Sequence, residues 1–382
     1  MEIEKDIYVL NRYMKEHRKW FHMHPELGFE VTKTREYIIK ELTTVGVDDI
    51  CVFAGGVRGI IFAQKEAPTL AFRADMDALE LEEKTGLEYK STIKGRMHAC
   101  GHDGHMSMLL GLAKWAVTNK ERLNYNIMLI FQPAEESIGG ALPMIEEGVL
   151  ENPRPESIFA FHIFPHIEQG RIGLKSGPLM AQTTEFDIRL NGKTAHGAMP
   201  QEGIDTIVAA ANLVNGLQTL ISRRIDPMDN AVITIGKLMA GERRNILAER
   251  AILEGTIRTF DDNVYKKLKK HIIDMLEGLE RSYDVVGEFK ELTYYSVVDN
   301  DKMLIDKVKG LLNAENIVEA KPLMIAEDFS FFQREVPGIM MLLGSGNKKR
   351  GYIHPLHSNK FNFDNDILAM GLQTMVHIIA GI

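Results

Sequence analysis

Two short apolar runs decide the fold of this chain: Asn126-Ile-Met-Leu-Ile-Phe131 and Ile158-Phe-Ala-Phe-His162. Both are nearly continuous in apolar residues, which is typical of central strands buried on both faces of a sheet. Over 105–119, between these runs and the start of the chain, apolar residues recur every three or four positions, which is typical of a half-buried helix. Further helices are expected over Glu4–His24 and Val31–Val45, and further strands over Gly56–Gln64 and Thr69–Ala74. This alternation predicts an α/β/α sandwich around a mixed, mainly parallel sheet.

The middle of the chain has a different order of elements. Strands are expected over Thr184–Leu190, Ala231–Ala240, Arg250–Phe260 and Val285–Tyr295, and helices over Ile204–Ser222 and Asn263–Tyr283. The resulting β-α-β-β-α-β order is that of a ferredoxin-like unit. Helix–strand alternation then resumes with Met303–Leu312, Gly338–Leu343 and a helix from Ile367. We therefore predict a domain over 183–295 that is inserted into a larger domain made of 1–182 and 296–382.

The composition is that of an ordinary globular protein. The 382 residues are 45% hydrophobic and 26% charged, and the net charge is -8. A negative balance argues against nucleic acid or an anionic membrane as the main partner. No apolar run is long enough to cross a bilayer. The first residues mix acids and bases and lack the apolar stretch of a signal peptide, so a cytoplasmic location is expected.

Five short segments carry side chains that can bind metals or move protons. They are Met97-His-Ala-Cys-Gly-His-Asp-Gly-His105, which contains Cys100 and His102; Glu135-Glu136 directly after a strand; His162 inside an apolar run; Asp75-Met-Asp77; and His354-Pro-Leu-His357. Each alone has an ordinary explanation, such as a polar loop, a solvated turn or a satisfied core histidine. However, three end predicted strands and one opens a helix, and in open α/β sheets such groups gather outside the carboxyl ends of the strands. We expect the five to converge on one crevice.

The ligand types favour a dinuclear hydrolytic site over a structural zinc site. Structural zinc sites commonly use paired Cys-x-x-Cys motifs, and the two cysteines, Cys51 and Cys100, form no such pair. The adjacent Glu135 and Glu136 resist joint ionisation unless a cation neutralises them. Mixed ligands from distant segments plus a spare carboxylate fit two metals that share a water. Cys51 has no such neighbours and is expected in the core, without a disulfide.

Taken together, these motifs resemble those of the aminoacylase and carboxypeptidase group of dinuclear metallo-amidohydrolases. The resemblance is to the branch that contains hippurate hydrolases, auxin-conjugate hydrolases and N-acyl-amino-acid deacylases, and it covers nearly the whole chain. Beyond the five segments, it extends to His24-Pro-Glu-Leu-Gly28, Phe72-Arg-Ala-Asp-Met-Asp-Ala78, Gln132-Pro-Ala-Glu-Glu136, Gly192-Lys-Thr-Ala-His-Gly-Ala-Met-Pro200, Glu254-Gly-Thr-Ile-Arg258, Ala326-Glu-Asp-Phe-Ser330 and His357-Ser-Asn-Lys360. Other branches have a His where Asp75 stands and an Asp where Cys100 stands.

The resemblance implies a role for each matching residue. Two divalent ions per subunit (zinc, manganese, cobalt or nickel) would be held by Cys100, which bridges them, and by His102, Glu136, His162 and His357. Glu135 would be the general base, and Asp77 would orient a ligand. His196, in the inserted domain, would reach the site of the partner subunit in a homodimer. Asn245 and Arg258 would hold the carboxylate of the substrate.

The implied activity is hydrolysis of the amide bond of N-acyl-L-amino acids, of the acetyl or aroyl type, to a carboxylic acid and a free amino acid. N-acetyldiaminopimelate is one narrower candidate substrate. A dipeptidase or aminopeptidase on the same site is an alternative, as is a non-catalytic metal-binding scaffold, although Glu135 beside every expected ligand disfavours the scaffold. A small N-acylated or peptide-like substrate is expected, with neither nucleic acid nor membrane as a partner.

Overall fold

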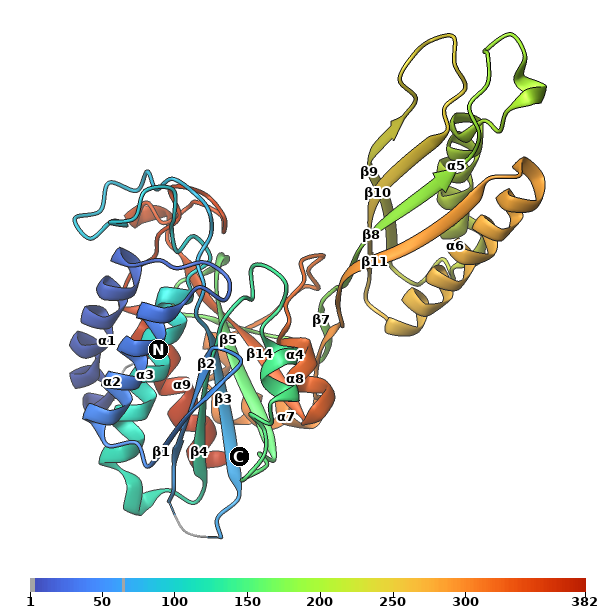
Figure 1. Ribbon diagram of the computed structural model, residues 1–382. Coiled ribbons are helices and arrows are strands. Elements are labelled where there is room, and N and C mark those ends of the chain that lie inside the picture. Colours follow the sequence, from blue (N-terminus) through green and yellow to red (C-terminus); the bar gives the residue numbers. More distant parts are fainter. Residues whose placement is uncertain (1–3, 64–65) are drawn as a thin grey trace. The chain divides into compact units, whose positions relative to one another are not determined.

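The computed structural model describes residues 4–63 and 66–382 and divides into two compact units (Figure 1). The large unit consists of 1–179, 299–321 and 328–382. The small unit consists of 180–298 and 322–327. The small unit therefore interrupts the chain of the large one.

The large unit is built on a mixed sheet of order β1-β2-β4-β3-β5-β14-β6-β13. Its strands are β1 (Asp49–Phe53), β2 (Gly56–Ile61), β3 (Thr69–Asp75), β4 (Asn126–Gln132), β5 (Ser157–Glu168), β6 (Ile172–Leu174), β13 (Ile317–Glu319) and β14 (Gly338–Gly346). The four central strands β4, β3, β5 and β14 run parallel, and β1, β2 and β6 pair antiparallel to their neighbours on the central side. The predicted α/β fold with a mixed sheet is confirmed.

Helices cover both faces of this sheet, as Figure 1 shows. The main apolar core lies under α1 (Lys5–Met23), α2 (Thr32–Val45), α3 (His102–Thr118), α7 (Lys302–Leu311) and α9 (Ile367–Gly381). The shorter α4 (Ala141–Glu146) and α8 (Phe329–Glu335) pack against each other, and α8 also packs on β5 and β14. Strands β3, β4 and the first part of β5 are fully buried, as continuous apolar runs predict.

The register of the central strands brings three polar residues to one level. Asp75 at the end of β3 is opposite Gln132 at the end of β4. On the other side, β3 and β5 pair only as far as Arg73 and Ala160, so His162 lies just beyond the last β3 partner of β5. The prediction that β5 ends at His162 is wrong, because β14 continues to pair with it as far as Glu168. Nevertheless, His162 stands where β3 has already ended.

The small unit has the predicted β-α-β-β-α-β order. It contains β8 (Gln182–Asn191), α5 (Thr206–Arg224), β9 (Ala231–Ala240), β10 (Arg250–Thr259), α6 (Asp262–Tyr283) and β11 (Val286–Tyr295). Its antiparallel sheet has the order β11-β8-β10-β9, which is that of a ferredoxin-like fold. Helices α5 and α6 pack on it through an apolar core of their own. Two further short strands, β7 (Gly177–Met180) and β12 (Val298–Asn300), pair with each other where the chain passes between the units.

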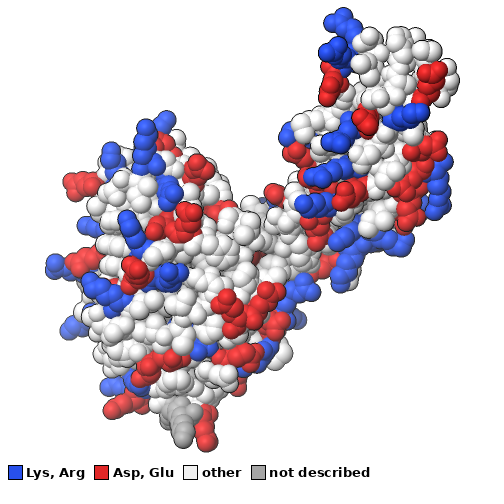
Figure 2. All heavy atoms as spheres, in the orientation of Figure 1, with Lys and Arg blue, Asp and Glu red and all other residues white. Residues whose placement is uncertain are grey.

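Several local features differ from the predictions. Helix α3 begins at His102 rather than His105, and Cys51 lies half-buried on the edge strand β1 rather than in the core. The short strands and α4 and α8 are too brief to produce a clear periodic pattern. None of the helices described is both long and apolar enough to cross a membrane. On the face drawn in Figure 2, acidic and basic side chains are mixed over both units.

Candidate metal centre

A tight turn before α3 sets the first two candidate ligands. Gly101, between Cys100 and His102, has a φ of +94°, in the left-handed region that favours glycine. A Cβ there would lie 3.2 Å from the Cβ of Ile163, which is tighter than ordinary packing allows. The turn places Cys100 just before the helix and His102 at its first position, and both side chains are buried. Both the backbone conformation and this close neighbour therefore favour glycine at 101.

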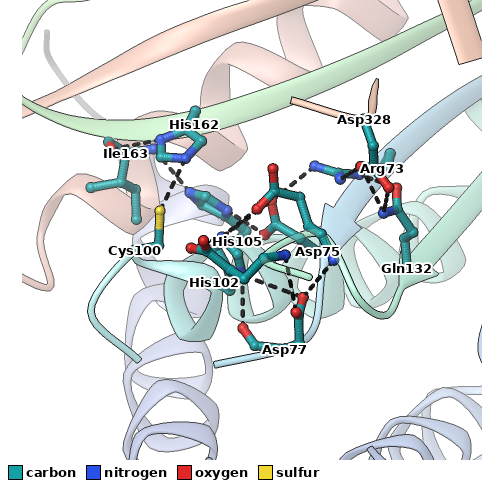
Figure 3. Close-up of polar contacts among 12 residues, drawn as sticks. Arg73, Asp75, Asp77, Cys100, His102, His105, Gln132, His162, Ile163 and Asp328 are labelled. Atoms are coloured by element: carbon teal, nitrogen blue, oxygen red, sulfur yellow. Dashed lines mark hydrogen bonds and ion pairs between the residues drawn. The ribbon is translucent and has the colours of Figure 1, made fainter. Parts of the chain in front are cut away.

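Cys100, His102 and His162 form one group that could hold a metal ion, with ligand atoms within 4.8 Å of one another (Figure 3). The Nδ1 of His102 lies 2.8 Å from the main-chain oxygen of Asp77, and the Nδ1 of His162 lies 2.9 Å from that of Ile163. A carbonyl can only accept, so both Nδ1 atoms carry the proton and both Nε2 atoms keep a lone pair. The Nε2 of His162 is 3.5 Å from the Sγ of Cys100. The two imidazoles are thus held in the tautomer that binds metals through Nε2.

Cys100, Glu136 and His357 form a second such group, so Cys100 is common to both. The Nε2 of His357 lies 3.2 Å from the Oε1 of Glu136. The main-chain N–H of His357 donates to the oxygen of Ala99, which ties its loop to the residue before Cys100. His357 has a φ of +61°, a left-handed conformation that costs a non-glycine residue about 1–3 kcal/mol and is commonest at functional sites.

Asp77 organises the turn that carries Glu135 and Glu136. Its Oδ1 accepts from the main-chain N–H of Glu135 at 2.9 Å, and its Oδ2 accepts from that of Glu136 at 3.1 Å. Ala134, just before them, also has a left-handed φ of +60°. Because both oxygens of Asp77 face the main chain, Asp77 shapes the turn and leaves both glutamate side chains for the cluster.

The electrostatics of the cluster, taken without a cation, are unfavourable to its ligands as a set. Burial raises the pKa of the Cys100 thiol well above its usual range, and Glu136 and Glu135 add to the effect. Burial lowers the pKa of His162 to about 3 and also lowers that of His102, so both imidazoles are neutral at physiological pH. Burial opposes ionisation of Glu136, but the nearby His357, His102 and Cys100 together outweigh it and lower the pKa of Glu136. The contact with Glu136 in turn raises the pKa of His357.

The surroundings of the Nε2 of His102 indicate which kind of ligand the cluster could bind. The Nε2 of His102 is buried and has no hydrogen-bond partner among the described residues. Three carboxylate oxygens nevertheless face it: those of Asp75 at 3.6 Å, Glu136 at 3.8 Å and Glu135 at 4.0 Å. A buried lone pair that confronts negative oxygens is unfavourable unless a cation lies among them. The soft thiolate, the neutral imidazoles and the carboxylates are together a donor set suited to divalent transition metals.

The remaining candidate site residues belong to the small unit. His196 and Asn245 are exposed, and their segments pair: His196 bridges Ile246, and the N–H of Gly197 donates to the oxygen of Asn245. Arg258 is half-buried on β10, where burial lowers its pKa and the nearby Glu185 opposes that shift. The structure therefore brings seven of the ten predicted residues together in the large unit and three in the small one.

Sequence reasoning assigned no role to the buried polar side chains behind the cluster. Arg73 donates to Asp75 at 2.8 Å, to Gln132 at 2.8 Å and to Asp328 at 2.9 Å. His105, three residues after His102, donates to Asp75 at 2.6 Å. An arginine in the middle of a predicted, largely apolar strand was the available signal, because a buried charge requires partners.

A cavity of about 800 Å³ opens in the large unit at the carboxyl ends of β5 and β14. It is lined by Pro165, His166, Glu168, Gln169, Gly170, Gly346, Asn347, Lys348, Lys349, Tyr352 and Ile353. Its walls are continuations of the two segments that carry candidate ligands, since His162 precedes Pro165 on β5 and His357 follows Ile353. The volume is that of a small-molecule site.

A family model described as peptidase family M20/M25/M40 matches residues 71–381. The chain belongs to this family. It is 37% identical to thermostable carboxypeptidase 1 of Saccharolobus solfataricus over 97% of this chain and 95% of that protein. It is 39% identical to N-acetyldiaminopimelate deacetylase of Bacillus subtilis, over 95% and 96% of the two chains. Among solved structures, a dinuclear metal-binding M20 peptidase of Bacillus subtilis superposes with a TM-score of 0.84 at 30% identity, covering 97% of this chain and 98% of that one.

These comparisons confirm the predicted resemblance to the family. They also confirm the prediction that the protein is an enzyme of the metallopeptidase and amidohydrolase class. The relatives named above act on peptides or on an N-acetylated amino acid, by their names. The chain covers at least 95% of the length of each of these proteins.

Proposed function

We propose that this M20 enzyme hydrolyses the amide bond of small N-acyl-L-amino acids, of the acetyl or aroyl type, at a two-metal site. The observation that carries the proposal is the pair of candidate ligand groups that share Cys100, with Glu135 beside them. Within this cluster the Nε2 of His102 has no hydrogen-bond partner in the described part of the chain and faces three carboxylates. Cys100, His102 and His162 would hold one ion, and Cys100, Glu136 and His357 the other. Bound divalent ions supply a water of lowered pKa and polarise the amide carbonyl.

Glu135 is the residue proposed to move protons. It is buried, and its Oε2 lies 4.0 Å from the Nε2 of His102, at the edge of the first ligand group. A carboxylate at this place can take a proton from the attacking water and return it to the amine that leaves. Asp77 supports it by holding its main-chain N–H. A positioned acid–base group of this kind contributes about 10²–10⁴ in rate.

Three residues of the small unit are proposed to recognise substrate. Arg258 would bind the free carboxylate through its planar guanidinium, and Asn245 would assist it. His196 would donate to the carbonyl oxygen as negative charge develops there, in the site of a partner subunit. Exposed apolar residues on the edge strand β9, Val232, Leu238 and Met239, support a homodimer formed through the small unit.

The cavity beside β5 is proposed to take the variable part of the substrate. Lys348 and Lys349 on its wall make no ion pair with any described residue, whereas Glu168 pairs with Arg171 at 3.6 Å. The wall is therefore suited to a substrate with a second negative group. Both cysteines are free, which agrees with a reducing compartment, and we propose a cytoplasmic location.

The test is a panel of substrates assayed with metal-free protein refilled by zinc, manganese, cobalt or nickel. N-acetyl and N-benzoyl amino acids, N-acetyldiaminopimelate and dipeptides are compared by kcat/KM. We expect the highest values for N-acyl amino acids with a free carboxylate. Faster cleavage of dipeptides would overturn the proposal in favour of a peptidase, and a metal-loaded protein inert on the whole panel would indicate a binding scaffold.

A further inference from the structure

His105 is a third buried imidazole that touches both candidate ligand histidines of the first group. It lies one helical turn after His102 on α3, and its ring centroid is 5.4 Å from that of His102 and 5.0 Å from that of His162. Both of its nitrogens are occupied: Nδ1 donates to Asp75 at 2.6 Å, and Nε2 accepts from the main-chain N–H of Ile163 at 2.9 Å. His105 therefore lies beside the candidate ligands but has no free lone pair with which to bind a metal.

Asp75 is occupied in the same way. Its Oδ1 accepts from His105, and its Oδ2 accepts from Arg73 at 2.8 Å. Figure 3 shows the resulting chain from Arg73 through Asp75 and His105 to Ile163, just behind the ligands. The side chains of Arg73, Asp75 and His105 are each at most 3% exposed. Although Asp75 lies within reach of His102, its oxygens are held by neighbours.

This series of hydrogen bonds ends at Ile163, where β5 is no longer paired with β3. The β3 side of β5 has no strand partner beyond Ala160, so the N–H of Ile163 has no place in the sheet ladder on that side. His105 supplies the acceptor that the strand lacks. Ile163 directly follows His162, so this hydrogen bond fixes the backbone that carries the ligand. A buried N–H left without an acceptor loses its hydration without compensation.

We infer that His105 is a positioning residue: it holds His162 through the backbone of Ile163, while Asp75 fixes the tautomer of His105 and takes no part in metal binding. The inference rests on the proposed metal site. Groups that orient metal ligands in this manner typically change metal affinity by about 10–100-fold when removed. Arg73 extends the same chain, because it also holds Gln132 and Asp328 at 2.8 Å and 2.9 Å.

Two amide substitutions separate the two hydrogen bonds of His105. In His105→Gln the longer side chain places an amide oxygen near the Nε2 position, where it can accept from Ile163. In His105→Asn the shorter side chain reaches only the Nδ1 position and Asp75. Cobalt is titrated into metal-free protein, and its affinity and the absorption of its complex with the Cys100 thiolate are recorded without substrate. His17→Gln is the matched control, since His17 is a buried histidine bonded to Tyr37 on the outer helices.

We expect the Asn variant to bind cobalt 10–100-fold more weakly than wild type in one of two sites and to show altered absorption. The Gln variant should lie closer to wild type, and the control should equal it. Wild-type affinity and absorption in both variants, or a stronger defect in Gln than in Asn, would overturn the inference. If the wild type itself binds no cobalt, the proposed metal site fails instead, so the two failures are distinguishable.

Discussion

The large and small units use polar side chains in opposite ways. At the carboxyl ends of β3, β4 and β5, the large unit buries charged and ionisable groups in a hydrogen-bonded network that leaves the Nε2 of His102 unpaired among the residues the structure describes. In the small unit, His196 and Asn245 are exposed and Arg258 is half-buried on an open sheet. Buried, preorganised groups are suited to chemistry, and accessible ones to recognition. The contrast agrees with the proposal that the large unit carries the residues for bond cleavage and the small unit residues for substrate recognition.

The strongest test of the contrast is removal of the proposed base. Glu135→Gln keeps size and main-chain contacts with Asp77 but cannot accept a proton as a carboxylate does. We expect kcat to fall about 10²–10⁴-fold while two metals per subunit are retained. Rates and metal content by atomic spectroscopy are measured on the same samples. Glu121→Gln, on an exposed turn, is the control. Full turnover in a metal-loaded Gln variant would remove Glu135 from the mechanism.

The shared ligand provides the second test. Cys100 belongs to both ligand groups, whereas His162 and His357 belong to one each. We therefore expect Cys100→Ala to lose both metals and His162→Ala to lose one. Because burial raises the thiol pKa, metal binding must also release a proton, so affinity should rise with pH. Equilibrium dialysis at several pH values measures both effects. Equal metal loss in the two variants would contradict a bridging role.

Sequence patterns predicted much of this division, for identifiable reasons. Continuous apolar runs marked β4 and β5, and the β-α-β-β-α-β order of the elements marked the small unit. The candidate ligands were recognisable because Cys, His and paired Glu are rare beside buried strands. Partners far apart in the chain were not: Arg73 and Asp328 are joined only by folding. The start of α3 was missed because the left-handed Gly101 turn, and not a periodic pattern, determines it.

For the small unit, the test is a change in recognition without a change in chemistry. Arg258→Ala should raise KM about 10–100-fold for substrates with a free carboxylate, the equivalent of one charge-assisted hydrogen bond of about 1.5–3 kcal/mol. The kcat should change little. Lys237→Ala, which breaks an exposed pair with Glu254 on the same sheet, is the control. If amide-capped substrates lose as much as free acids, Arg258 is only a structural partner of Glu185.

Buried histidines should also make the large unit sensitive to acid. Burial lowers the pKa of His17 to about 4, below the value of about 6.5 expected for the unfolded chain. Between these values the unfolded state binds more protons, so stability falls as pH drops from about 6.5 towards 4. His17→Gln should remove about 1–2 kcal/mol of this pH dependence at pH 5. Urea unfolding of metal-free protein at pH 7.5 and pH 5 measures it, and an unchanged difference would contradict the assignment.

The smallest expected effect concerns the cavity beside β5. If the cavity helps to select the substrate, then the large unit also takes part in recognition, and the contrast between the two units is not complete. Lys348 and Lys349 are exposed, so each contributes only about 0.2–1 kcal/mol to an ion pair. The double change Lys348→Gln and Lys349→Gln should therefore lower kcat/KM several-fold for N-acyl glutamate and hardly at all for N-acyl leucine. Lys307→Gln on α7, away from the cavity, is the control. A several-fold loss that disappears at high salt would show that the large unit also selects substrate, by charge; equal losses for both substrates would mean that selection belongs to the small unit alone.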